Sequence, residues 1–302
     1  MLAAARVLAP SLETARRLAR CLDCQAALEG NEACPACGRL YPEQDGILSA
    51  IGALTGTNRI AAEFYNGPHW PRFRRWEQIF LWFQKGVRGA RMQVLRHLPR
   101  LDRARVLEVG IGDGENLRFL PAGWTVLGVD IARKRLEACR DRFPNLAGRL
   151  VWAEGEDLPF PDASFDAVYS VGGFNYFRDH AAALGEMRRV AWPGAPVIVA
   201  DEITNLYHLS PARLLGFEGL EHRALCGMGL APEFVTMVLS LSVDIPTIAQ
   251  RELPGHRSFS IWNRLGYCIV DPDPGLDRPL KKTWESAYVG RNNIAAACLE
   301  GE

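Results

Sequence analysis

Between residues 104 and 200 the sequence alternates short apolar runs with amphipathic segments. The apolar runs have the length of buried strands, and they predict strands at residues 105–109, 125–129, 150–153, 165–170 and 196–200. The segments between them predict helices at residues 132–143 and 181–190. Strands separated by helices favour an α/β fold with a parallel, doubly wound sheet, whose ligand binds at the carboxyl ends of the strands.

The first of these strands leads into a glycine-rich turn that contains Gly110, Gly112 and Gly114, with Glu108 two residues before the first glycine. This spacing differs from the Gly-x-Gly-x-x-Gly turn of dinucleotide sites. A carboxylate here suits a ligand with an ammonium group better than a pyrophosphate, and glycines let a ligand lie against the backbone. The second strand ends at Asp130, where carboxylates bind ribose hydroxyls in nucleotide-binding folds.

Residues 153–168 (AEGEDLPFPDASFDAV) and 186–194 (EMRRVAWPG) carry a family resemblance. Together with the glycine turn they resemble the class I S-adenosylmethionine-dependent methyltransferases, most nearly the subgroup of ubiquinone and menaquinone C-methyltransferases. The resemblance covers residues 60–202 and weakens beyond them. It implies a Rossmann-like sheet, S-adenosylmethionine as cofactor, and methyl transfer to oxygen, nitrogen or carbon of a small organic acceptor, aromatic or quinone-like.

The resemblance also implies roles at the glycine turn. Glu108 and Gly110 would hold the methionyl end of the cofactor, and Gly112 and Gly114 would form the floor beneath it. The residues that line the reaction channel in this family correspond here to Val171 and Gly172.

The nucleoside end of the cofactor is assigned by the same resemblance. Asp130 would bind the ribose diol, and Ile131 would lie against the adenine. Glu154 stands where the family usually has Asp and would accept a hydrogen bond from the adenine amino group, with the Gly155 amide facing a ring nitrogen. The longer Glu side chain leaves the exact contact open.

Four cysteines near the start of the chain follow a metal-ligand spacing. Cys21, Cys24, Cys34 and Cys37 read Cys-x2-Cys-x9-Cys-x2-Cys, which predicts two knuckles around one tetrahedral zinc ion. Four thiolates leave no open position, so the zinc is predicted to be structural, with disulfides, a redox pair or an iron site as alternatives. Residues 39–47, with a turn at Asp45-Gly46, predict the hairpin of a small ribbon.

Residues 64–83 are rich in aromatic side chains and predict a lid over the cofactor. Within this segment, Ile79, Phe80, Trp82 and Phe83 are interpreted as core, whereas Tyr65 and Trp70 are predicted to contact substrate. Asn175 and Tyr176, which follow the fourth predicted strand, are predicted to do the same, with a structural turn as the alternative.

A phenolic or carbon nucleophile needs a proton acceptor in addition to positioning. His69, beside Gly67-Pro68, is the first candidate for that catalytic role. Asp201, at the end of the fifth predicted strand, is the second.

The predicted organisation has two parts. Residues 1–57 form an N-terminal helix and the zinc ribbon, and residues 58–302 form the methyltransferase domain. Within the domain, residues 58–100 are the aromatic lid and residues 203–258 are a helical cap insertion with helices at 211–220 and 231–241. Residues 258–270 would supply the final strands.

Composition limits the remaining choices. No run approaches the roughly 18 apolar residues that cross a bilayer, so no membrane span is predicted. The four other cysteines are scattered singly, which suits a reducing compartment and a cytoplasmic protein. The Ala- and Arg-rich first twenty residues are interpreted as an amphipathic helix, with a transit peptide as the alternative. No oligomeric state is indicated.

Two other functions stay open. An N-terminal four-cysteine ribbon on this fold also resembles the rRNA guanine-N1 methyltransferases, whose ribbons recognise RNA. The net charge of +0 disfavours a nucleic-acid partner, although Arg72, Arg74 and Arg75 form a basic group. The third possibility is a non-catalytic scaffold that binds a partner protein, against which the intact glycine turn with Glu108 and Asp130 argues.

Overall fold

The computed structural model describes residues 14–204 and 219–271, all of which fall within one compact unit, Met1–Pro272. The start of the predicted N-terminal helix lies outside the described residues, and so does nearly all of the helix predicted at 211–220. α1 (Ala15–Leu18) is the first described helix.

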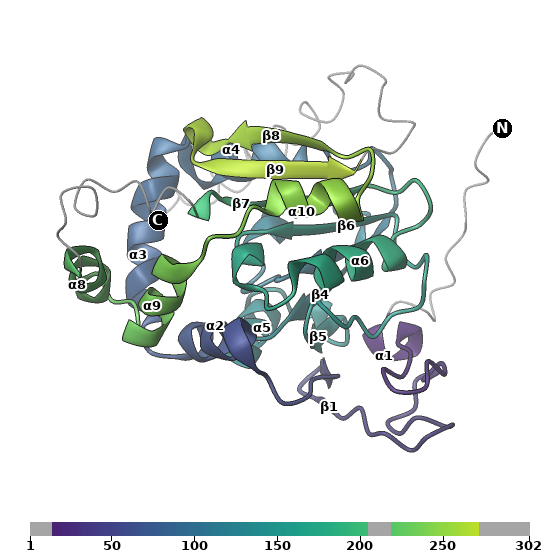
Figure 1. The fold of residues 1–302 in the computed structure, drawn as a ribbon. Helices are drawn as coiled ribbons and strands as arrows, with labels where there is room; N and C mark the ends of the chain where they lie inside the picture. The colour runs from purple at the N-terminus through teal and green to yellow at the C-terminus, as the bar shows by residue number, and fades with distance from the viewer. Residues whose placement is uncertain (1–13, 205–218, 272–302) are drawn as a thin grey trace, which may run out of the picture. The chain divides into compact units, whose positions relative to one another are not determined.

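Nine strands form one mixed sheet within the described part of the chain (Figure 1). They are β1 (Glu43–Gln44), β2 (Ile47–Ser49), β3 (Arg105–Val109), β4 (Thr125–Asp130), β5 (Leu150–Trp152), β6 (Ala167–Val171), β7 (Val197–Glu202), β8 (Arg257–Ile261) and β9 (Gly266–Asp271). Their order is β1-β2-β5-β4-β3-β6-β7-β9-β8, and the strands from β5 to β7 run parallel. β9 is antiparallel to both neighbours.

Helices cover both faces of the sheet. α6 (His180–Val190) and α10 (Ile245–Glu252) share a buried apolar cluster with one face and lie in front of it in Figure 1. α4 (Gly86–Leu95) and α5 (Arg133–Arg142) share a cluster with the other face. This arrangement confirms the predicted doubly wound, Rossmann-like α/β fold. α4 and α10 fall inside the ranges predicted as lid and cap, and both helices pack on the sheet.

Short 3₁₀ turns connect several elements. They are η2 (Glu115–Phe119), η3 (Pro144–Leu146), η4 (Phe174–Tyr176) and η6 (Trp262–Arg264). η2 directly follows the glycine turn.

The cysteine-rich segment, residues 14–50, is joined to the sheet by its hairpin. β1 and β2 form the predicted hairpin around Asp45-Gly46, and β2 then pairs in parallel with β5, with Ile47 opposite Leu150. This segment is the purple ribbon beside β5 in Figure 1. The sequence predicts the hairpin as part of a separate ribbon, whereas the structure makes it the edge of the central sheet.

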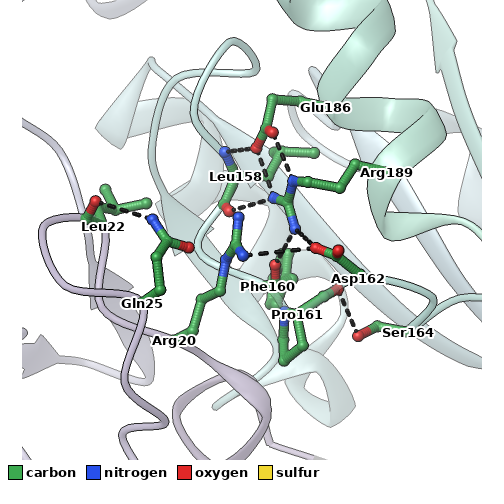
Figure 2. A network of polar contacts seen from close by, with 10 residues as sticks. All are labelled: Arg20, Leu22, Gln25, Leu158, Phe160, Pro161, Asp162, Ser164, Glu186 and Arg189. Atoms are coloured by element: carbon green, nitrogen blue, oxygen red, sulfur yellow. Dashed lines mark hydrogen bonds and ion pairs between the residues drawn. The ribbon is translucent and has the colours of Figure 1, made fainter.

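The loop after β5 is held by the Arg189 side chain of α6 (Figure 2). Its guanidinium donates to the carbonyl oxygens of Leu158 and Phe160, at 3.0 and 2.7 Å, and pairs with Glu186. Its contact with the Asp162 carboxylate, at 2.9 Å, is shared with Arg20 of the cysteine-rich segment, at 3.5 Å. The network therefore connects that segment, the loop and α6.

Four helices build a third apolar cluster above the carboxyl end of the sheet. They are α2 (Gly56–Asn66), α3 (Trp70–Phe83), α8 (Leu220–Gly227) and α9 (Pro232–Ser240). Phe64 of α2 stacks on Phe234 of α9 with ring centroids 3.9 Å apart. No single helix among the described residues is long and apolar enough to cross a membrane, although the bent pair α9 and α10 would meet that criterion by length and composition alone.

The outer side of α3 contradicts the prediction that Ile79, Trp82 and Phe83 are core. Their side chains are 51%, 71% and 65% exposed, whereas Leu81 beside them is buried. The apolar pattern of this helix therefore faces outward as well as inward.

Candidate cofactor and acceptor site

A cavity of about 440 Å³ opens at the carboxyl ends of four neighbouring strands. The last residues of β3, β4, β6 and β7 all line it: Val109, Asp130, Val171 and Glu202. Helices α2, α3, α8 and α9 supply side chains to the opposite wall. The volume falls in the range of small-molecule sites, roughly 300–1,000 Å³, and the position is the one where doubly wound sheets bind ligands.

The glycine turn forms one wall of the cavity. Gly110 and Gly112 line it, and both have positive φ, at 76° and 56°. A Cβ at Gly112 would meet no atom within 4 Å, so backbone is open to a ligand there. Gly114 is predicted to form part of the floor beneath the cofactor, but it does not line the cavity. A Cβ at Gly114 would lie 2.6 Å from Leu117 and 2.8 Å from Cys139. Gly114 instead allows the turn to pack against α5.

Glu108 places a buried carboxylate beside this turn. It accepts hydrogen bonds from Asn116 Nδ2 at 2.6 Å and from the Tyr169 hydroxyl at 2.7 Å. Burial raises the pKa of Glu108 to about 7 despite these two donors. Asn116 also lines the cavity, and its buried Oδ1 has no partner among the described residues. An acceptor pair of carboxylate and amide oxygen is chemically suited to an ammonium group.

The end of β4 presents Asp130 to the cavity. Its carboxylate accepts from the backbone amides of Gly112, at 2.8 Å, and Ala132, at 2.7 Å. Burial raises the pKa of Asp130, opposed by these amide donors. Ile131 and Gly155 line the cavity next to it.

Glu154 does not line the cavity, contrary to its predicted contact with adenine. Its Oε1 accepts from Asn58 Nδ2 of α2 at 2.8 Å, and the same amide donates to Glu156 at 2.9 Å. Asn58 Oδ1 accepts from the Arg178 amide at 3.0 Å. Asn58, which the sequence does not single out, therefore holds α2 onto the loop after β5, and Glu154 belongs to that structural contact.

Aromatic side chains dominate the end of the cavity under the helices. Tyr65, Trp70, Phe73, Tyr176 and Phe234 all line it. Trp70 Nε1 is buried without a hydrogen-bond partner among the described residues, which leaves a donor for a ligand. Tyr65 and Trp70 therefore lie where the substrate prediction needs them.

The carboxylate that reaches this end is Glu202, and not the predicted Asp201. Side chains alternate along a strand, so Glu202 lines the cavity while Asp201 points to the loop after β6. Asp201 is fully buried and accepts from the amides of Gly173, Asn175 and Glu202 itself. This placement removes Asp201 from any contact with an acceptor, and the sequence misses Glu202 by one residue.

Of the two residues after β6 that are predicted to contact substrate, only one lines the cavity. Tyr176 lines the cavity, and its hydroxyl donates to Glu202 Oε1 at 2.7 Å. Asn175 does not line the cavity: its Nδ2 donates to the Glu202 carbonyl and its Oδ1 accepts from the Tyr267 hydroxyl. Asn175 is the structural turn residue that the sequence leaves as the alternative, whereas Val171 and Gly172 just before it line the cavity.

His69 also lies outside the cavity. It precedes α3, and its Nδ1 is 3.1 Å from the Gly229 carbonyl oxygen, which can only accept, so Nδ1 donates. The ring joins α3 to the segment between α8 and α9. Because His69 does not line the cavity, its position argues against the prediction that it is the catalytic proton acceptor.

Two further lining residues are not among the predicted site residues. Arg74 of α3, which the sequence suggests only as part of a basic group, pairs with Asp113, and with Glu115 at 3.0 Å, so it fastens α3 to the glycine turn. Trp262, in the hairpin between β8 and β9, lines the cavity with a left-handed φ of 51°, and its Nε1 donates to the Ala90 carbonyl at 3.1 Å.

The four predicted metal ligands come together in a separate cluster. All four sulfurs lie within 4.8 Å of one another, and the pairs Cys21–Cys37 and Cys24–Cys34 are 3.5 and 3.4 Å apart. Sulfurs at tetrahedral corners about 2.3 Å from a zinc ion lie about 3.8 Å apart, so this donor set fits zinc. The Tyr41 hydroxyl donates to Cys21 Sγ at 3.3 Å and orients one of the thiols.

The sheet order and the cavity define a Rossmann-like α/β protein with a ligand site at the carboxyl edge of its parallel strands. A family model described as "Methyltransferase domain" matches residues 107–199. The O-methyltransferase rstn1 of Aspergillus nomiae is 30% identical over 170 residues, which cover 54% of this chain and 70% of that protein. The chain belongs to the methyltransferase family.

Other similar proteins match over shorter stretches. The demethylmenaquinone methyltransferase of Deinococcus radiodurans is 34% identical over 119 residues, 38% of this chain. The match spans about half of that relative, 48% of its length. The structure of Haemonchus contortus phospholethanolamine N-methyltransferase 2, in complex with phosphomonomethylethanolamine and S-adenosylhomocysteine, has a TM-score of 0.47 at 17% identity, over 66% of this chain and 46% of that one.

Proposed function

We propose that the protein transfers the methyl group of S-adenosylmethionine to a small, largely apolar acceptor, aromatic or quinone-like. The observation that carries the proposal is the single cavity in which Glu108, the glycine turn and Asp130 face an aromatic wall. The first three features suit the charged and polar ends of the cofactor, and the wall suits a flat organic molecule.

The cofactor roles follow from the contacts. Glu108 and Asn116 Oδ1 would accept from the ammonium of the methionyl end, and Asp130 from the ribose hydroxyls. Gly110 and Gly112 would leave room for the cofactor against the backbone, with Ile131 and Gly155 beside its base and Val171 and Gly172 along the channel. When bound, S-adenosylmethionine supplies an electrophilic methyl group on a sulfonium.

Cofactor binding is expected to depend on pH through Glu108. Its pKa is about 7 without ligand, so below that pH the carboxyl must lose a proton before it can hold an ammonium. Calorimetric titration with S-adenosylhomocysteine should therefore show affinity that falls up to about tenfold per pH unit below about pH 7. Glu108→Gln should bind more weakly with a flat profile. Parallel profiles for variant and wild type would remove Glu108 from the methionyl site.

The residues of the acceptor end have separate tasks in the proposed reaction. Trp70 Nε1 would donate to an acceptor oxygen, and Tyr65, Phe73 and Phe234 would exclude water from it. Glu202 would take the proton that a phenolic acceptor releases as its oxygen or carbon bonds to the methyl group. Tyr176 would orient the Glu202 carboxylate through their 2.7 Å hydrogen bond.

Trp70→Phe tests the acceptor end. The change keeps the aromatic ring and removes one neutral hydrogen bond, so KM for the acceptor should rise roughly threefold to tenfold with little change in kcat. Trp124→Phe is the matched control, because Trp124 Nε1 donates to the Leu101 carbonyl outside the cavity. An unchanged KM in Trp70→Phe, measured with a panel of quinols and phenols, would contradict the assignment.

The cysteine cluster is proposed to hold one structural zinc ion. The close approach of all four sulfurs supports the metal, and the pairing of β2 with β5 supports a structural task.

The rRNA alternative has less support. Arg74, a member of its basic group, pairs with Asp113 and Glu115 at the glycine turn. The scaffold alternative leaves the unpartnered Asn116 Oδ1 and Trp70 Nε1 of the cavity without a purpose.

A further inference from the structure

Helix α3 carries an apolar stripe that faces away from the protein. Exposed residues recur along it at helical spacing, so they share one face: Arg72, Arg75, Trp76, Ile79, Trp82 and Phe83. Trp76, at the near end of the apolar part, is 45% exposed, and Trp82 and Phe83 are still more exposed and contact each other edge to face, with centroids 5.0 Å apart. The opposite face is the one that packs on the body, through Leu81 and Gln84.

This stripe is surrounded by positive charge. Residues 70–88 contain five Lys or Arg residues and one Glu, although the whole chain has a net charge of +0. Arg74 is used inside the protein by its ion pairs with Asp113 and Glu115. Arg72, Arg75, Lys85 and Arg88 are exposed, and they form no ion pair with any residue that the structure describes. Arg72 and Arg75 precede the apolar residues on α3, whereas Lys85 follows the helix and Arg88 lies on α4.

The same helix forms part of the cavity wall. Trp70, Phe73, Arg74, Trp76, Gln78 and Leu81 line the cavity. Trp76 and Gln78 are also exposed, so the rim of the cavity lies on the border of the outward stripe. Trp82 and Phe83 lie outside the cavity and have no part in binding within it.

We propose that α3 docks the protein on an anionic lipid surface, with Ile79, Trp82 and Phe83 inserted at the level of the headgroups. Interfacial helices combine an apolar face rich in Trp and Phe with basic residues that reach the headgroups. Trp side chains are enriched at the boundary between lipid and water. Docking on this face would bring the rim of the cavity next to the lipid, from which an apolar acceptor could enter without crossing water.

The pattern favours lipid over RNA. An RNA-binding face tracks phosphates with cations spread along a groove and stacks bases on aromatic rings between them. On α3 the exposed cations, Arg72 and Arg75, stand in the first half of the helix, and the second half holds an aliphatic side chain, Ile79, beside Trp82 and Phe83. That arrangement gives a continuous apolar surface bordered by charge.

The test is flotation of the full chain with vesicles. Wild type should bind vesicles of mixed phosphatidylglycerol and phosphatidylcholine, and bind them less as salt is raised. Trp82→Glu combined with Phe83→Glu should weaken binding on the order of a hundredfold, because burial of each such side chain is worth about tenfold. Arg75→Gln combined with Arg88→Gln should weaken it about fivefold for each cation lost.

Two controls separate docking from misfolding. Leu101→Glu changes another exposed apolar residue, 45% exposed and outside α3, and should bind vesicles like wild type. Trp82→Phe should still bind, but should lose a large part of the fluorescence quenching that brominated lipids produce in the wild type. Flotation requires no substrate, so its result is independent of the proposed methyl transfer.

Three outcomes would overturn the proposal. The first is undiminished flotation of the Trp82, Phe83 double variant with its thermal midpoint intact. The second is a wild type that ignores vesicles but binds single-stranded RNA through the same residues. The third is a stable dimer in sedimentation that the double variant abolishes, with no vesicle binding by the wild type.

Discussion

Glu202→Gln is expected to lower the rate constant for methyl transfer roughly 10²- to 10⁴-fold, the range for loss of a positioned proton acceptor. Gln keeps the shape of the side chain and the hydrogen bond from Tyr176, but it cannot take a proton. Affinity for S-adenosylhomocysteine should stay near the wild-type value, because Glu202 lies at the acceptor end of the cavity. Single-turnover rates with a phenolic acceptor measure the effect.

The pH profile distinguishes a lost base from a disturbed site. A preformed phenolate needs no proton acceptor, so the variant should recover activity as pH approaches the pKa of the acceptor. Glu137→Gln removes a carboxylate that pairs with Arg133 outside the cavity, and it should behave as wild type. An unaltered rate in Glu202→Gln at neutral pH would assign the Glu202–Tyr176 pair to packing.

Cys34→Ser is expected to release the metal and unfold the cysteine-rich segment, because metal binding and local folding are one equilibrium in such small modules. Amide exchange of residues 14–50 should accelerate on the order of 10³-fold or more, which corresponds to several kcal/mol of local stability. The exchange of β5 should also accelerate, since β2 is its hydrogen-bonded neighbour at the sheet edge. Metal analysis and hydrogen exchange provide the readouts.

Cys226→Ser is the control, because Cys226 is a half-buried thiol of α8 away from the cluster. It should keep one zinc ion per chain and normal exchange in the segment. Full protection of residues 14–50 in the presence of a chelator would refute the structural zinc.

Local patterns predicted the sheet well. The strands β3, β4, β5 and β7 start within a residue of their predicted positions, because each is a short buried run between turn residues. β6 starts at Ala167 and not at 165, since Phe165 forms only an isolated bridge with Ala191. The glycine turn and Asp130 could be placed at the carboxyl edge for the same reason: strand ends in a parallel sheet meet at one edge.

The other features of the site depend on contacts between residues far apart in the sequence, which no local pattern predicts. β7 continues to Glu202, two residues past its predicted end at 200, and this extension decides which acidic side chain reaches the cavity. His69 and Glu154 are polar residues beside the site whose partners, Gly229 and Asn58, lie 160 and 96 residues away. An apolar stripe marks a helix face, but whether that face meets core or solvent is a property of its neighbours, as Trp82 illustrates.

The pairing of β2 with β5 has a consequence for the order of events during synthesis. Ile47 faces Leu150, so about a hundred residues must be made after β2 before its partner strand exists. All four thiols have by then left the ribosome and can close around the proposed zinc ion, because Cys37 precedes β2 in the chain. We therefore expect the hairpin of β1 and β2 to be folded when β5 emerges. β2 then gives β5 a preformed strand to pair with, and such pairing between distant residues is the slowest kind to form.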